Sequence, residues 1–181
     1  IPRPIDLAYV WGDALEELAR RSPSLRIVNL ETAVTAGGEP WPGKGIHYRL
    51  HPGNAPCLRA ARVDCCVLAN NHVLDWGYKG LDDTLATLRG LGIATAGAGH
   101  DVAEAAAPAV RALPGGGRLL VLAFAHRSSG VPSEWAAAAH QAGVNLLPDL
   151  GEVTVERIAG QVRALRRPGD IVLASLHWGG N

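Results

Sequence analysis

The stretch Val67–Leu88, VLANNHVLDWGYKGLDDTLATL, determines the fold that we expect for this chain. An apolar run ends at Asn70-Asn71-His72, and leucines at helical spacing follow after two glycines. This pattern predicts a buried strand, a polar loop at its carboxyl end and an amphipathic helix. In α/β sheets, ligands bind in the crevice beyond such strand ends, because the loop side chains point into it.

The polar loop has two interpretations. Two adjacent amides and an imidazole are costly to bury without partners, so they either satisfy one another and the loop backbone or meet a ligand or metal. Asn70 and Asn71 can be turn-formers, since asparagine tolerates the left-handed region and bonds its own backbone. Asp75 can cap the next helix or turn.

Length and composition favour one ordinary globular domain over residues 1–181. Lysine plus arginine and aspartate plus glutamate each number 17, so the net charge is zero and we expect no nucleic-acid partner. No apolar run approaches the roughly 20 residues of a membrane span, and the start IPRPIDLAYV predicts no secretory signal. The adjacent Cys65 and Cys66 point opposite ways in a strand, so we expect core thiols, not a bridge, and a cytoplasmic location.

Strands and helical stretches alternate along the chain, which predicts an α/β fold. The apolar pattern predicts helices at 12–21, 55–62, 133–142 and 152–166, and a helical turn at 104–107. It predicts strands at 25–30, 92–99, 118–125 and 170–176. The last two are apolar enough to be buried on both faces.

Polar residues follow three of the predicted strands. Glu31 follows the first, Asn70-Asn71-His72 the second, and His177 the last. If these strands are parallel neighbours, a carboxylate, amides and two imidazoles meet at one edge of the sheet. Such donors suit Zn²⁺, Mn²⁺ or Fe²⁺, so a metal site is one of the two interpretations that the spacing leaves open.

The segment Thr35–Asn54 is a second candidate region. It is rich in glycine and proline and is long for a plain connection, and loops of this length are often functional. Lys44, His47, Arg49 and His51 within it are suited to binding carboxylates or phosphates.

Four segments together resemble the CapA family of capsule-synthesis or poly-γ-glutamate biosynthesis proteins, which is related to calcineurin-like metallophosphoesterases. They are IVNLETAVT (Ile27–Thr35), DCCVLANNHVLDWGYKGLDDTLATL (Asp64–Leu88), GIATAGAG (Gly92–Gly99) and ASLHWGGN (Ala174–Asn181). The motifs occur in order over nearly the whole chain. ANNHxxDxG followed by GLxxTL is the most specific of them.

The resemblance implies a metallophosphoesterase-like α/β/β/α sandwich, with a centre of two divalent ions (Mn, Fe or Zn) at the strand ends. It implies that Glu31, Asn71 and His177 bind metal. It also implies that His72 faces the substrate as an acid or hydrogen-bond donor and that Asp75 orients His72.

The expected substrate is an anionic polymer or a phosphoester. We expect it to contact four residues: Asn29, Asn70, Lys44 and Arg49. The expected reaction is metal-assisted hydrolysis of a phosphoester or amide-type bond in capsule or poly-γ-glutamate metabolism. The alternatives are a non-catalytic module that binds an anionic polymer through Thr35–Asn54, and an inactive remnant of the enzyme.

Two features of the family are not found in this sequence. Members begin with a strand that ends in Gly-Asp, whereas Gly12-Asp13 here opens a predicted helix. Members also carry a GHxxH motif beyond HWG. We therefore expect the chain to be an interior segment of a longer protein or a truncated gene product, with an incomplete sandwich and an incomplete metal centre.

Overall fold

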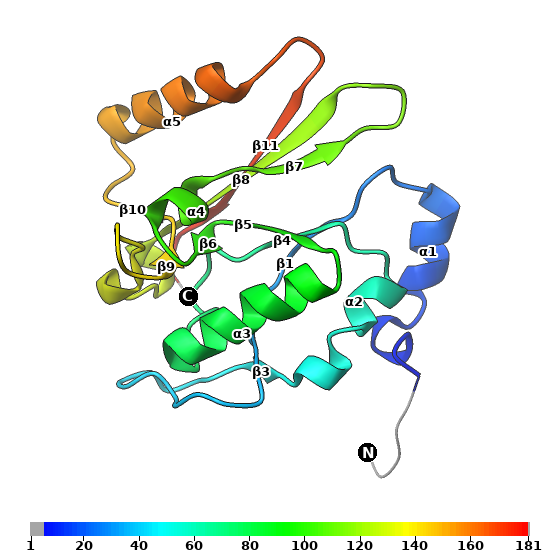
Figure 1. Ribbon diagram of the computed structural model, residues 1–181, viewed down its shortest axis with the longest axis horizontal. Helices are drawn as coiled ribbons and strands as arrows, with labels where there is room; N and C mark the ends of the chain where they lie inside the picture. The colour runs from blue at the N-terminus through cyan, green and yellow to red at the C-terminus, as the bar shows by residue number, and fades with distance from the viewer. Residues whose placement is uncertain (1–5, 181) are drawn as a thin grey trace.

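Two sheets lie face to face between helices in the computed structural model, which describes residues 6–180 (Figure 1). The first sheet has three parallel strands in the order β1 (Ile27–Asn29), β4 (Cys65–Val67), β5 (Ala94–Ala96). In the second sheet, β8 (Arg118–His126) is parallel to β10 (Leu146–Leu147) and β11 (Ile171–His177) and antiparallel to β7 (Ala109–Ala112). This arrangement confirms the expected α/β fold of the metallophosphoesterase-like kind.

Strand β8 shows why the sequence of the second sheet is so apolar. Its side chains from Leu119 to Ala125 are all buried, and alternate residues face opposite sides of the sheet. Leu119, Val121, Ala123 and Ala125 belong to the main core between the two sheets. Leu122 and Phe124 belong to a smaller core under the helix that covers the outer face. The predicted burial of this strand on both faces is therefore confirmed.

The two longest helices form the outer layers. Helix α3 (Gly77–Gly90) covers the first sheet, and α5 (Glu152–Leu165) covers the second (Figure 1). The leucines predicted to face the core from α3, at positions 81, 85 and 88, are buried. The shorter helices are α1 (Ala14–Arg21), α2 (Cys57–Ala60) and α4 (Val102–Ala106). The 3₁₀ helices are η1 (Tyr9–Trp11), η2 (Pro52–Asn54), η3 (Arg127–Ser129) and η4 (Ser133–Trp135).

Two small strand pairs hold the connections. Strand β2 (Ala33–Val34) is parallel to β3 (Arg49–Leu50), and β6 (Ala98–Gly99) is antiparallel to β9 (Gly143–Val144). The β2–β3 pair joins the two ends of the segment that separates them, and Thr84 Oγ1 of α3 accepts a hydrogen bond from the backbone N–H of Val34 at 2.7 Å. The residues between β2 and β3, which make up most of the segment Thr35–Asn54, therefore form a loop whose two ends are held together by strand pairing.

The prediction of a helix at 133–142 is wrong. Only Ser133–Trp135 is helical, as one 3₁₀ turn. After Trp135, which is fully buried, the alanines bond to other segments, as the N–H of Ala137 does to the carbonyl of Val144. Alanine favours a helix, but a short helix without a strong apolar stripe is marginal and tertiary contacts override it.

Two further strands differ from the sequence-based expectation. Strand β7 lies outside the predicted strands, and it forms a hairpin with β8 through Gly115–Gly117. Strand β11 is present as predicted, but none of its side chains is buried, because it lies at an edge of its sheet. Within residues 6–180, no helix is both long enough and apolar enough to cross a membrane.

Candidate active site

Glu31, Asn71 and His177 come together although 106 residues separate the last two. His177 Nε2 lies 3.2 Å from Asn71 Oδ1 and 3.8 Å from Glu31 Oε1. Strands β1 and β4 are parallel neighbours, so Glu31 and Asn71 follow strands that end at the same edge. The sequence analysis considered the strand before His177 as a parallel neighbour of the other two. Strand β11 is not their neighbour, because it belongs to the second sheet. The packing of the two sheets, and not pairing within one sheet, brings His177 to this place.

The three side chains fit a divalent cation by chemistry. A carboxylate oxygen, an amide oxygen and an imidazole nitrogen are the donors that Zn²⁺, Mn²⁺ and Fe²⁺ accept. In the described part of the chain, no group of three or more His, Cys, Asp and Glu side chains is placed to hold a metal. Only three side chains supply donors here, and one of them is a neutral amide. A cation at this place would therefore need further ligands from water or from other groups.

Asp75 orients His72. Asp75 is fully buried, and its Oδ2 lies 2.7 Å from His72 Nδ1. A carboxylate at Nδ1 places a proton on that nitrogen and leaves Nε2 for other partners. The ring of Tyr48 stacks on the imidazole with 4.2 Å between ring centroids and so restricts its rotation.

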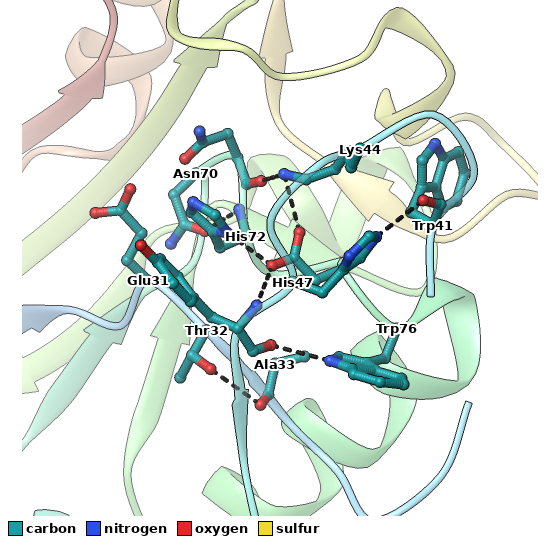
Figure 2. Close-up of polar contacts among 12 residues, drawn as sticks. Glu31, Thr32, Ala33, Trp41, Lys44, His47, Asn70, His72 and Trp76 are labelled. Carbon is teal, nitrogen blue, oxygen red and sulfur yellow. Dashed lines mark hydrogen bonds and ion pairs between the residues drawn. The ribbon is translucent and has the colours of Figure 1, made fainter. Parts of the chain in front are cut away.

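The long segment between β2 and β3 is attached to the same carboxylate. Lys44 Nζ forms an ion pair with Asp75 Oδ1 at 2.9 Å, and the backbone N–H of Tyr48 donates to Oδ2 at 2.6 Å. Lys44 also donates to the carbonyl of Asn71. Figure 2 shows Lys44 extending from this segment toward the residues around His72. The sequence predicts Lys44 as a substrate contact, and its ammonium group already has these protein partners.

Asn70 forms bonds within the protein, as the turn-forming alternative predicts. Its Nδ2 donates to Asn29 Oδ1 at 3.1 Å and to the Leu30 carbonyl at 3.0 Å, and its Oδ1 accepts from the N–H of His72. Asn29 in turn donates to Glu31 Oε2 at 3.1 Å. The two asparagines therefore connect Glu31 to the His72 loop, and a substrate contact from Asn70 would require one of these bonds to break.

Arg49 is exposed beside the site. Its guanidinium lies 3.9 Å from the centroid of the Trp76 ring. Trp76 Nε1 donates to the carbonyl of Tyr48 at 3.1 Å (Figure 2). The described residues give Arg49 no acidic partner, so its charge is available to a ligand.

Tyr48, which stacks on His72, has no role in the sequence-based predictions. It lies in a segment without periodicity, and only its aromatic character within a long loop signalled it. The cysteines are core residues, as expected: burial raises the pKa of Cys66 to about 12, and all three thiols are free.

Two packed sheets with a carboxylate, an amide and an imidazole at their strand ends define an α/β protein of the metallophosphoesterase-like kind. The sequence profile of the bacterial capsule synthesis protein PGA_cap family matches residues 1–181, so the chain belongs to this family. The family resemblance deduced from the motifs is thereby confirmed.

Two relatives illustrate the family. The chain is 45% identical over 182 residues to a probable polyglutamine synthesis accessory protein of Mycobacterium tuberculosis, and the match covers 100% of this chain and 48% of the relative. It is 26% identical over 136 residues to the PGA biosynthesis protein CapA of Bacillus subtilis, and that match covers 75% of this chain and 33% of the relative. The chain thus spans about half the length of the mycobacterial protein.

Proposed function

We propose that the protein containing this chain is a metal-dependent hydrolase of the metallophosphoesterase type that takes part in the synthesis of a capsular glutamate polymer. The observation that carries the proposal is the position of His177 Nε2 beside both Asn71 Oδ1 and Glu31 Oε1. The names of the two relatives, which refer to polyglutamine synthesis and to PGA biosynthesis, support the connection to a polymer.

The site residues divide into metal ligands and a proton-transfer pair in this proposal. Glu31, Asn71 and His177 would hold a cation, and His177 would then present the lone pair of Nε2 and carry its proton on Nδ1. A pair of divalent ions, when bound, would polarise a substrate oxygen and lower the pKa of a bound water to near neutrality. His72 transfers a proton through Nε2 to or from the reacting group, since Asp75 occupies Nδ1.

The metal claim is tested by elemental analysis and by Mn²⁺ titration calorimetry of the full-length protein. Glu31→Gln and His177→Ala are expected to weaken Mn²⁺ binding at least about 10-fold, since each removes a ligand. His100→Ala is the matched control, because His100 is exposed and bonded to Glu104 and Asp82 outside the site. Equal Mn²⁺ affinity in all four proteins would refute the site.

Catalysis is tested with a generic phosphodiester in the presence of Mn²⁺. His72→Ala is expected to lower kcat about 10²- to 10⁴-fold while the protein keeps its metal. A variant with full activity and full metal content would exclude His72 from the reaction.

A non-catalytic polymer-binding module is the competing function. Lys44 contributes little to it, because its side chain is 15% exposed and paired with Asp75, whereas Arg49 is free to bind an acidic group. Binding of poly-γ-glutamate in the presence of a chelator, lost in Arg49→Ala, would favour this module over the hydrolase.

A further inference from the structure

Tyr48 belongs to the long segment between β2 and β3 and lies over the imidazole of His72. The two rings are stacked, with 4.2 Å between their centroids and an angle of 27° between their planes. The side chain of His72 is only 10% exposed, whereas Tyr48 is 48% exposed. The tyrosine ring therefore lies between one face of the imidazole and solvent.

A single carboxylate oxygen fixes the spacing of these two residues. Asp75 Oδ2 lies 2.7 Å from His72 Nδ1, and the same oxygen accepts the backbone N–H of Tyr48 at 2.6 Å. Asp75 is fully buried, and Lys44 Nζ pairs with its other oxygen at 2.9 Å. Because Oδ2 belongs to a group that is held on both oxygens, one atom sets the distance between the main chain of Tyr48 and the imidazole.

The carbonyl side of Tyr48 is also held. Trp76 Nε1 donates to the Tyr48 carbonyl at 3.1 Å (Figure 2). The guanidinium of Arg49, the next residue, lies 3.9 Å from the centroid of the Trp76 ring. The main chain of Tyr48 is thus bonded on both sides, and it cannot move away from His72 unless one of these bonds breaks.

The hydrogen bond from Asp75 does not by itself fix the direction of His72 Nε2. It determines the tautomer and one point of the ring, and the ring can still turn about that bond. Contact with a flat aromatic face removes this freedom, because stacked rings stay close to parallel. No group within residues 6–180 forms a hydrogen bond with His72 Nε2. The plane of the imidazole therefore decides where this nitrogen points.

We propose that Tyr48 is a positioning residue, whose ring fixes the plane of the His72 imidazole and so directs Nε2 toward the reacting group. The expected effect on rate rests on the proposed hydrolase, whereas the fixed plane of the ring does not. The phenol hydroxyl of Tyr48 has no hydrogen-bond partner in the described part of the chain, so the aromatic ring alone performs this task. Phenylalanine should therefore replace Tyr48, and alanine should not.

Steady-state hydrolysis of a phosphodiester by the full-length protein with Mn²⁺ tests the effect on rate. Tyr48→Ala is expected to lower kcat about 10- to 100-fold with KM changed less than about 3-fold, because a misdirected Nε2 impairs proton transfer and not binding. Tyr48→Phe should keep kcat within about 3-fold of the unmodified protein. Full kcat in Tyr48→Ala, or an equal loss in Tyr48→Phe, would overturn the proposal.

Tyr78→Ala is the matched control for these variants. Tyr78 has a similar exposure, 42%, and its ring packs edge-on against Trp41 and not on His72. Its kcat should stay within about 3-fold of the unmodified value. A loss in Tyr78→Ala as large as that in Tyr48→Ala would assign the effect to the packing of the loop and overturn the specific role of Tyr48.

NMR of the histidine ring protons gives a second result that requires no activity. In the metal-free full-length protein, the stacked ring of Tyr48 should shift the ring protons of His72 upfield, and His72→Gln identifies these signals by their absence. The shift should vanish in Tyr48→Ala and persist in Tyr48→Phe and Tyr78→Ala. Unchanged signals in Tyr48→Ala would overturn the proposal at any rate of hydrolysis. The expected shifts without hydrolysis by any of the proteins would support the fixed imidazole plane and refute the hydrolase.

Discussion

One carboxylate connects the candidate catalytic histidine to the loop that covers it. Asp75 accepts from His72 and from the backbone of Tyr48, and it forms an ion pair with Lys44. Because Asp75 is fully buried, its charge requires compensation. Lys44 provides it, and the conformation of the loop and the orientation of His72 are therefore coupled.

Removal of Lys44 should be costly to stability. Lys44→Met leaves a buried carboxylate without its cation, and we expect a loss of about 3–5 kcal/mol in the free energy of unfolding. The double variant Lys44→Met, Asp75→Asn should lose less than the sum of the two single variants, because the unpaired charge is gone. Urea denaturation measures all four proteins.

Lys79→Met is the matched control for this experiment. Lys79 pairs with Asp83 on the surface of α3 and its side chain is 62% exposed, so its removal should change stability by less than about 1 kcal/mol. Strict additivity in the double variant, or an equal cost for Lys79→Met, would show that Lys44 and Asp75 are not energetically coupled.

The residues of the site differ in how well the sequence revealed them. Glu31, Asn71 and His177 each follow a predicted strand directly, so their places depended only on the fold. The partners of Asp75 depended on the path of an irregular segment, and no periodicity predicts such a path. The sequence therefore indicated Lys44 as a substrate residue and did not reveal its ion pair.

At one glycine, Gly97, the two sheets pack too closely to admit a side chain. Gly97 lies between β5 and β6 with φ +89°, and a Cβ there would lie 2.7 Å from both Ala69 Cβ and Ala123 Cβ. Ala69 follows β4 of the first sheet and Ala123 belongs to β8 of the second. Glycine is thus required here because the backbone has a positive φ and because there is no space for a side chain.

Gly97→Ala should reduce the free energy of unfolding by about 2–5 kcal/mol, the combined cost of positive φ and overpacking. Gly115→Ala separates the two causes, because Gly115 has φ +87° and a methyl group there would meet no atom within 4 Å. Its cost should be only about 1–2 kcal/mol. Urea denaturation of both variants measures the difference, and equal losses would mean that the sheets can move apart to accept a methyl group.

Element predictions succeeded where one clear pattern dominated. The helix at 152–166 and the strand at 118–125 follow from periodicity and from a continuous apolar run, and both are present. The helix expected at 133–142 is absent because its alanines carry helix propensity and almost no packing information. Strand β7 escaped prediction because AVRA is too short to show a period.

Polar contacts between distant elements make the stability of the whole molecule depend on pH. At one end, Arg118 Nη2 lies 2.5 Å from Asp170 Oδ2, which ties the start of β8 to the start of β11. At another place, His100 lies between Asp82 of α3 and Glu104 of α4, at 3.2 Å and 2.6 Å respectively. The two contacts respond to opposite changes of pH.

Acid should weaken the first contact. Arg118 holds the pKa of Asp170 at about 2, so this carboxylate binds its proton less readily in the folded than in the unfolded chain. Its contribution is complete above about pH 4, the ordinary aspartate value, and is lost as pH falls toward 2. Between pH 4 and 2.5, the urea midpoint of Asp170→Asn should fall less steeply with decreasing pH than the midpoint of the unmodified protein. An unchanged slope would assign acid sensitivity to other carboxylates.

Alkali should weaken the second contact. Glu104, followed by Asp82, raises the pKa of His100, so the folded chain binds this proton more tightly than the unfolded chain. The contribution is complete below about pH 6.5 and is lost as pH rises through the raised pKa. His100→Gln should therefore remove part of the decline in urea midpoint between pH 6.5 and 8. If the decline persists in full, the contact between α3 and α4 does not stabilise the fold through this proton, and the other histidines must account for the alkaline slope.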